Sequence, residues 1–134
     1  MTLLLDTRTI LWMTEQVPGL GSLARRTCED ALAAGELAIP AIVFYEAGQL
    51  LKRGRISGPH TVRDWRARLL SLGVLEAVVS ADIAVLAAEL DGLHGDPIDR
   101  IIVATAIVEG ALLLTADRHI LDWPGSMRRQ DARR

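Results

Sequence analysis

The segment from Asp96 to Asp117 reads as one complete helix followed by one buried strand, and it restricts the fold more than any other part of the chain. Asp96 is a good N-cap, Pro97 is a good first helical residue, and Gly110 is a natural helix end. The helix between them is apolar on nearly every side, which predicts that it is buried. The run Leu112–Leu114 is short and entirely apolar, as strands of parallel sheets tend to be.

The rest of the chain alternates in the same way. Short apolar runs predict further strands at residues 3–5, 36–40 and 74–79, and the last is placed at a sheet edge because it contains Glu76. Helices are predicted at residues 7–13, 22–34, 41–53, 61–72 and 80–90, with a break at Gly58-Pro59. This alternation predicts an α/β fold with a parallel sheet and right-handed crossovers. We expect a single domain over residues 1–126 and a polar, basic, loose C-terminal tail over residues 127–134.

The composition narrows the classes of protein that the chain can belong to. Its 134 residues carry a net charge of −2 at pH 7, which argues against binding of nucleic acid through bulk charge alone. No apolar run has membrane-spanning length, and the first residues lack the basic start of a signal peptide. Cys28 is the single cysteine, so the chain can form no internal disulfide. We therefore expect a cytoplasmic protein with no membrane association.

Four carboxylates occupy positions that a parallel sheet would bring together. Asp6 and Asp117 follow buried strands, and ligands of open parallel sheets bind beyond the carboxyl ends of the strands. Glu46 lies early in the helix after the second strand, and Asp99 lies in the first turn of the helix that leads to residues 112–114. Converging carboxylates repel one another unless a cation neutralises them, and all-oxygen ligation suits Mg²⁺ or Mn²⁺. Such an ion can polarise a phosphoryl oxygen and lower the pKa of an attacking water, which hydrolyses a phosphodiester.

Each of these acids also has a simpler explanation. Asp99 can complement the helix dipole, and Asp6 and Asp117 can cap the turns that follow strands. Glu46 lies within an otherwise apolar helix and needs no explanation if it faces solvent. The joint pattern of the four acids favours the metal site more strongly than any one of them does.

The four acids lie in four separate segments of the chain. The segments are Leu3-Leu4-Leu5-Asp6-Thr7; Phe44-Tyr45-Glu46-Ala47 followed by Lys52-Arg53-Gly54-Arg55-Ile56; His94-Gly95-Asp96-Pro97-Ile98-Asp99-Arg100-Ile101-Ile102-Val103-Ala104-Thr105-Ala106; and Leu113-Leu114-Thr115-Ala116-Asp117-Arg118. Together they resemble PIN-domain proteins and, among these, the VapC-type toxins of bacterial type II toxin–antitoxin systems. The resemblance covers essentially the whole domain.

The resemblance implies a three-layer α/β/α fold with a small central parallel sheet, and a metal-dependent endoribonuclease activity. It implies that Asp6 and Asp99 are the principal ligands of one or two Mg²⁺ or Mn²⁺ ions. Glu46 and Asp117 would hold metal-bound waters or a second ion, and Thr115 would orient a ligand or a water. The expected partners are an RNA substrate, a cognate antitoxin and a second copy of the chain in a homodimer.

Several side chains near the acids keep two interpretations. His94 could shuttle a proton or form a hydrogen bond within its loop, and Asp96 could be a helix cap or an outer acid of the site. The arginines at positions 53, 55, 63, 66 and 68 could form a rim that faces RNA or a solvated surface. Arg100 and Arg118 could contact the scissile phosphate or balance charge. The alternative to a nuclease is a catalytically silent PIN-fold module that binds RNA or protein.

Overall fold

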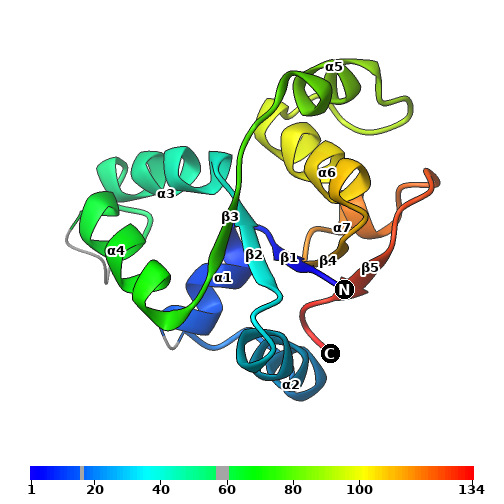
Figure 1. Ribbon diagram of the computed structural model, residues 1–134. Coiled ribbons are helices and arrows are strands. Elements are labelled where there is room, and N and C mark those ends of the chain that lie inside the picture. Colours follow the sequence, from blue (N-terminus) through cyan, green and yellow to red (C-terminus); the bar gives the residue numbers. More distant parts are fainter. Residues whose placement is uncertain (16, 57–60) are drawn as a thin grey trace.

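The computed structural model describes residues 1–15, 17–56 and 61–134, so the break predicted at Gly58-Pro59 lies outside the described residues. Within them the chain forms a five-stranded sheet in the order β3-β2-β1-β4-β5, and every pair of neighbouring strands is parallel (Figure 1). The strands are β1 (Leu3–Leu5), β2 (Leu37–Pro40), β3 (Leu75–Ala77), β4 (Leu112–Thr115) and β5 (Arg129–Asp131). The predicted parallel sheet is present, and β3 lies at its edge as expected.

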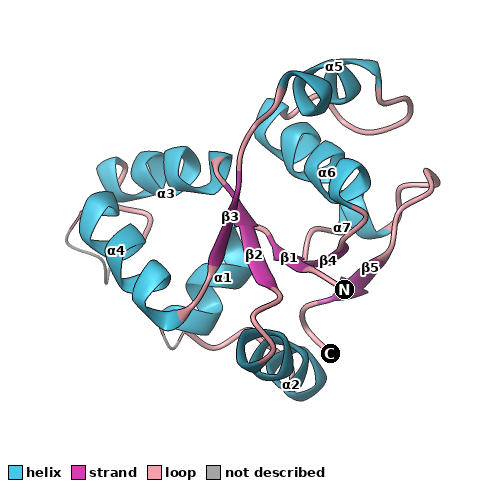
Figure 2. Cartoon of the chain, in the orientation of Figure 1, coloured by secondary structure: helices cyan, strands magenta, loops and turns pink. Residues whose placement is uncertain are grey.

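Helices cover both faces of this sheet and complete a three-layer α/β/α fold, which confirms the predicted architecture. Figure 2 shows α1, α3 and α4 on one side of the strands and α5 and α6 on the other. The helices are α1 (Thr7–Thr14), α2 (Ser22–Ala33), α3 (Ile42–Lys52), α4 (Val62–Leu72), α5 (Ala81–Glu89), α6 (Pro97–Glu109) and α7 (Arg118–Leu121). Among the described residues, no helix has the length and apolar character that crossing a lipid bilayer requires.

The core is centred on the middle strand, β1, and its neighbour β4. Leu5 of β1 is paired in register with Leu114 of β4, and both side chains are completely buried. Helix α6 covers these strands with the buried side chains of Ile102 and Val103, and it ends at Gly110 in the left-handed conformation. The helix that the sequence predicted to be buried therefore packs against β4 in the core of the molecule.

The prediction of a loose C-terminal tail over residues 127–134 is wrong. Residues Arg129–Asp131 form β5, which pairs with β4 along its outer edge. Ala132 is completely buried, and its carbonyl oxygen accepts a 2.9 Å hydrogen bond from the Gly21 backbone N–H. The Arg134 carbonyl oxygen accepts a 3.1 Å bond from Ala24 in the first turn of α2, where no side chain caps the helix. Backbone pairing fixes this segment, and a polar strand of that kind has no apolar run to mark it in a sequence.

Because Ala132 is buried, we expect Ala132→Asp to lower the free energy of unfolding by well over about 2 kcal/mol, since it buries an unpaired charge. The matched change Ser126→Asp, in the exposed turn before β5, should stay within about 0.5 kcal/mol of the parent. Urea denaturation measures both values. Equal small effects would show that residues 129–134 are not part of the folded structure.

Candidate active site

The four predicted acids line one cleft of about 930 Å³ at the carboxyl end of the sheet. Asp6 follows β1 directly, and Asp117 lies in the turn between β4 and α7. The chain leaves β1 toward β2 and leaves β4 toward β5, so these two acids flank the point at which the direction of winding reverses. Glu46 reaches the cleft from α3 and Asp99 from α6. The topology thus assembles in space four residues that are far apart in the sequence.

A threonine hydroxyl connects the ends of the two central strands. Thr115 Oγ1 donates a 2.5 Å hydrogen bond to Asp6 Oδ2 and accepts a 3.1 Å bond from the Asp117 backbone N–H. The other oxygen of Asp6 accepts bonds from the Thr9 backbone N–H at 3.0 Å and from the Thr9 hydroxyl at 2.6 Å. Asp6 is therefore the N-cap of α1 as well as a cleft residue. Its carboxylate is held in one orientation from both sides.

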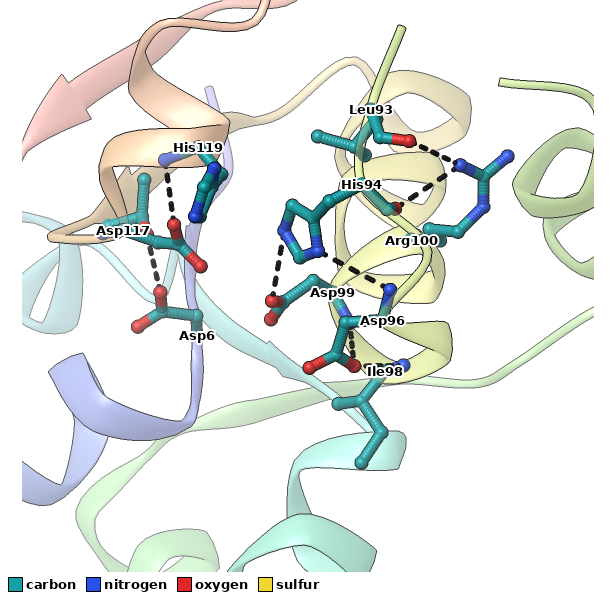
Figure 3. Close-up of polar contacts among 10 residues, drawn as sticks. Asp6, Leu93, His94, Asp96, Ile98, Asp99, Arg100, Asp117 and His119 are labelled. Carbon is teal, nitrogen blue, oxygen red and sulfur yellow. Dashed lines mark hydrogen bonds and ion pairs between the residues drawn. The ribbon is translucent and has the colours of Figure 1, made fainter. Parts of the chain in front are cut away.

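Two of the predicted acids form a compact group with a histidine at the edge of the cleft. Figure 3 shows Asp99 and Asp117 approaching one another, with the His94 ring beside Asp99. One ligand atom from each of these three residues lies within 4.8 Å of those of the other two. Asp117 is also the N-cap of α7 and accepts a 2.8 Å bond from the His119 backbone N–H. Asp6 and Glu46 line the cleft outside this group. His94 joins the two acids from behind Asp99, with its Nε2 buried.

The electrostatics of the cleft reflect crowded negative charge. Burial raises the pKa of Asp99 to about 8, and the nearby charges of Asp96 and Asp117 add to the effect. Burial also raises the pKa of Asp6, against the lowering effect of its bonds from threonine hydroxyls. The pKa of Glu46 is raised by burial and, further, by its acidic neighbours. A divalent cation would neutralise this repulsion, and carboxylate oxygens are the donors that Mg²⁺ and Mn²⁺ accept, so the cleft residues fit such an ion.

The arginine cluster predicted over residues 53–68 does not act as a unit. Arg66 forms a two-pronged pair with Glu76 at 2.7 and 2.8 Å, which connects α4 to β3. Arg68 pairs with Glu15 and connects α4 to the end of α1. Of this cluster, only Arg55 lines the cleft. Within the cluster, Arg66 and Arg68 fasten α4 to its neighbours.

Arg8 and Arg133, which the sequence analysis did not single out, line the cleft beside the acids. The guanidinium groups of Arg8 and Arg133 lie 6.0 and 5.6 Å from the centre of the half-buried Trp12 ring. Arg133 also donates a 2.6 Å hydrogen bond to the Ala116 carbonyl oxygen, which places it next to the end of β4. Arg118 lines the cleft as well, but it pairs with Asp122 and Asp131. The sequence analysis missed Arg133 because it did not predict β5.

Comparisons with known proteins agree with this geometry. The family model described as PIN domain matches residues 3–124. Ribonuclease VapC22 of Mycobacterium tuberculosis is 32% identical over 123 residues, which cover 89% of each chain. The fold is similar to a chain of the DNA-bound VapBC2 structure from Rickettsia felis (TM-score 0.68, 18% identity, 97% and 98% of the two chains). It is also similar to a chain of the DNA-bound VapBC structure from Salmonella typhimurium (TM-score 0.66, 19% identity, 98% of both chains).

The raised pKa of Asp99 predicts how stability depends on pH in a metal-free buffer with chelator. The folded protein keeps the proton of Asp99 up to about pH 8, whereas the unfolded chain loses it near the ordinary pKa of 3.8. The folded state therefore binds more protons in this window, and the free energy of unfolding should fall as the pH rises from about 5 to 8. Asp99→Asn should flatten that fall, as measured by urea midpoints at several pH values. A parent and variant with the same slope would contradict the assignment.

Proposed function

We propose that this chain, which belongs to the PIN-domain family, is a metal-dependent endoribonuclease. It hydrolyses RNA phosphodiester bonds and acts as the toxin of a toxin–antitoxin pair. The family membership agrees with the resemblance noted in the sequence. The observation that carries the proposal is the convergence of Asp6, Glu46, Asp99 and Asp117 on one cleft. The ribonuclease named among its relatives supports the choice of substrate class.

In this proposal each acid has a defined task. Asp6 and Asp99 bind the Mg²⁺ or Mn²⁺ ion directly, while Glu46 and Asp117 hold waters of the ion or a second ion. When bound, the ion would polarise the scissile phosphate and stabilise the charge that develops on it. Thr9 and Thr115 orient Asp6 through their hydroxyl groups, so that carboxylate meets the ion without first reorganising.

The partners are proposed from the relatives and from the charge of the cleft. Structural neighbours from Rickettsia felis and Salmonella typhimurium are VapBC complexes, and a further neighbour from Klebsiella pneumoniae is a toxin–antitoxin complex. An antitoxin with a cationic segment would complement the negative cleft of this chain. We also propose a homodimer and a cytoplasmic location, as the sequence led us to expect.

RNA cleavage by the purified, antitoxin-free protein tests the function. We expect cuts in total RNA with Mg²⁺ or Mn²⁺, no cuts with chelator, and a loss of at least about 100-fold in rate for Asp99→Asn. Asp82→Asn, which changes an exposed acid at the start of α5, is the matched control and should cut like the parent. With total RNA as the substrate, no target RNA has to be chosen in advance.

One outcome would favour the silent module instead. A folded protein that binds RNA or a protein partner, but cuts no RNA under either metal, would overturn the nuclease proposal.

The cleft arginines give a second prediction. Arg8→Gln and Arg133→Gln should raise the KM for RNA with little change in kcat, because phosphate contacts position a substrate. The slope of log affinity against log salt should fall by about 0.7 for each arginine–phosphate pair that the substitution removes. Arg63→Gln, on the exposed face of α4, serves as the control for general charge loss. An equal effect of all three changes would mean that bulk charge alone attracts RNA.

A further inference from the structure

Arg100 fixes the loop that precedes α6 by binding backbone carbonyl groups. Its Nε donates to the Ala87 carbonyl oxygen at 2.9 Å, and its Nη2 donates to Leu90 at 2.7 Å. Its Nη1 donates to the carbonyl oxygens of Leu93 at 2.9 Å and His94 at 3.4 Å. All three guanidinium nitrogens are thus engaged in holding the end of α5 and the following loop against α6. Figure 3 shows the contacts of Arg100 with Leu93 and His94. Neither sequence interpretation of Arg100, phosphate contact or charge balance, describes this role.

The residue that this loop places beside Asp99 is His94. Its Nδ1 accepts a 3.3 Å hydrogen bond from the Asp96 backbone N–H. A neutral imidazole that accepts at Nδ1 carries its hydrogen on Nε2. Nε2 is buried and has no hydrogen-bond partner among the described residues, and it lies 3.4 Å from Asp99 Oδ2. That separation slightly exceeds an ordinary N–H···O bond, and a small rotation of Asp99 would close it.

The same atoms allow a competing role, direct binding of the metal through Nε2. His94, Asp99 and Asp117 are close enough to one another for that. Coordination through Nε2, however, requires its lone pair, so the ring hydrogen would have to move to Nδ1. The Asp96 N–H already points at Nδ1, and two hydrogens would then face each other. The backbone at the start of α6 therefore favours the form of His94 that donates from Nε2.

We propose that His94 is a positioning residue whose Nε2–H holds the Asp99 carboxylate in the orientation that a divalent cation needs, and that Arg100 keeps His94 in place. This inference rests on the proposed function, because it assigns Asp99 to the metal. The donor is neutral, so it orients Asp99 without competing with the cation for its charge.

Binding of Mn²⁺ and Mg²⁺ to the RNA-free protein, measured by isothermal titration calorimetry, tests the proposal. His94→Ala should weaken the affinity for both ions by about 10- to 100-fold, as loss of groups that orient metal ligands does. His94→Gln should retain most of the affinity, because its amide N–H can replace the Nε2–H. The centres of the His119 and His94 rings are 4.8 Å apart. His119→Gln removes the neighbouring ring but leaves the Nε2–H of His94, so it should retain the affinity as well.

A second variant tests the role of the loop. Arg100→Met should weaken binding of both ions, and combining it with His94→Ala should add little, because the two residues act through one contact. Arg128→Met, which removes a similar arginine–carbonyl contact at the far end of α6, should not change the affinity. Urea midpoints of every variant show whether it is folded under the conditions of titration.

Each outcome decides a different point. If His94→Gln loses affinity as His94→Ala does, and more for Mn²⁺ than for Mg²⁺, then His94 is a direct nitrogen ligand and the positioning role is overturned. If His94→Ala binds both ions like the parent, His94 has no role toward the metal. If the parent itself binds neither ion, the metal-dependent function fails first, independently of His94.

Discussion

The hydrogen bond from the Thr115 hydroxyl to Asp6 joins the two strand ends on which the site is built. Because the same hydroxyl accepts the Asp117 N–H, one side chain sets the position of two carboxylates. Its own position follows from the β1–β4 register, in which Leu5 lies opposite Leu114 at the buried centre of the sheet. The geometry of the cleft therefore depends on the fully buried centre of the sheet. A shift of one residue in that register would turn the hydroxyl away from the cleft.

The cleft concentrates charges that the rest of the molecule must tolerate. Burial raises the pKa of Asp6, Glu46 and Asp99, and repulsion by neighbouring acids adds to the effect at Glu46 and Asp99, which means that folding is opposed by their negative charges. The surrounding core offsets this cost, since each fully buried leucine contributes about 1.5–3 kcal/mol. A cluster of charges that opposes folding, held by an apolar core, is the pattern expected of functional residues.

The sequence was enough to predict residues that follow apolar runs or lie near helix caps. It did not reveal residues whose position depends on backbone pairing or on the geometry of a loop. Asp6 and Asp117 were predictable because each follows an apolar run that had to be a central strand. Glu46 and Asp99 were predictable from their position on helices beside those strands. Arg133 could not be found, because the three residues of β5 are polar and are held by hydrogen bonds of the main chain. The place of His94 depends on Arg100 and on a backbone N–H, and a single sequence records neither contact.

The central position of β1 in the sheet also bears on how the chain is made. Asp6 and the Thr115 that binds it are 109 residues apart. At about 5–20 residues per second, a ribosome needs roughly 5–20 seconds to synthesise the chain between them. During that time the edge of β1 that pairs with β4 stays without its neighbour, and Asp6 lacks Asp99 and Asp117. A nascent chain is thus without the assembled carboxylate cluster until α6 and β4 have emerged, so the order of synthesis itself delays the appearance of the site.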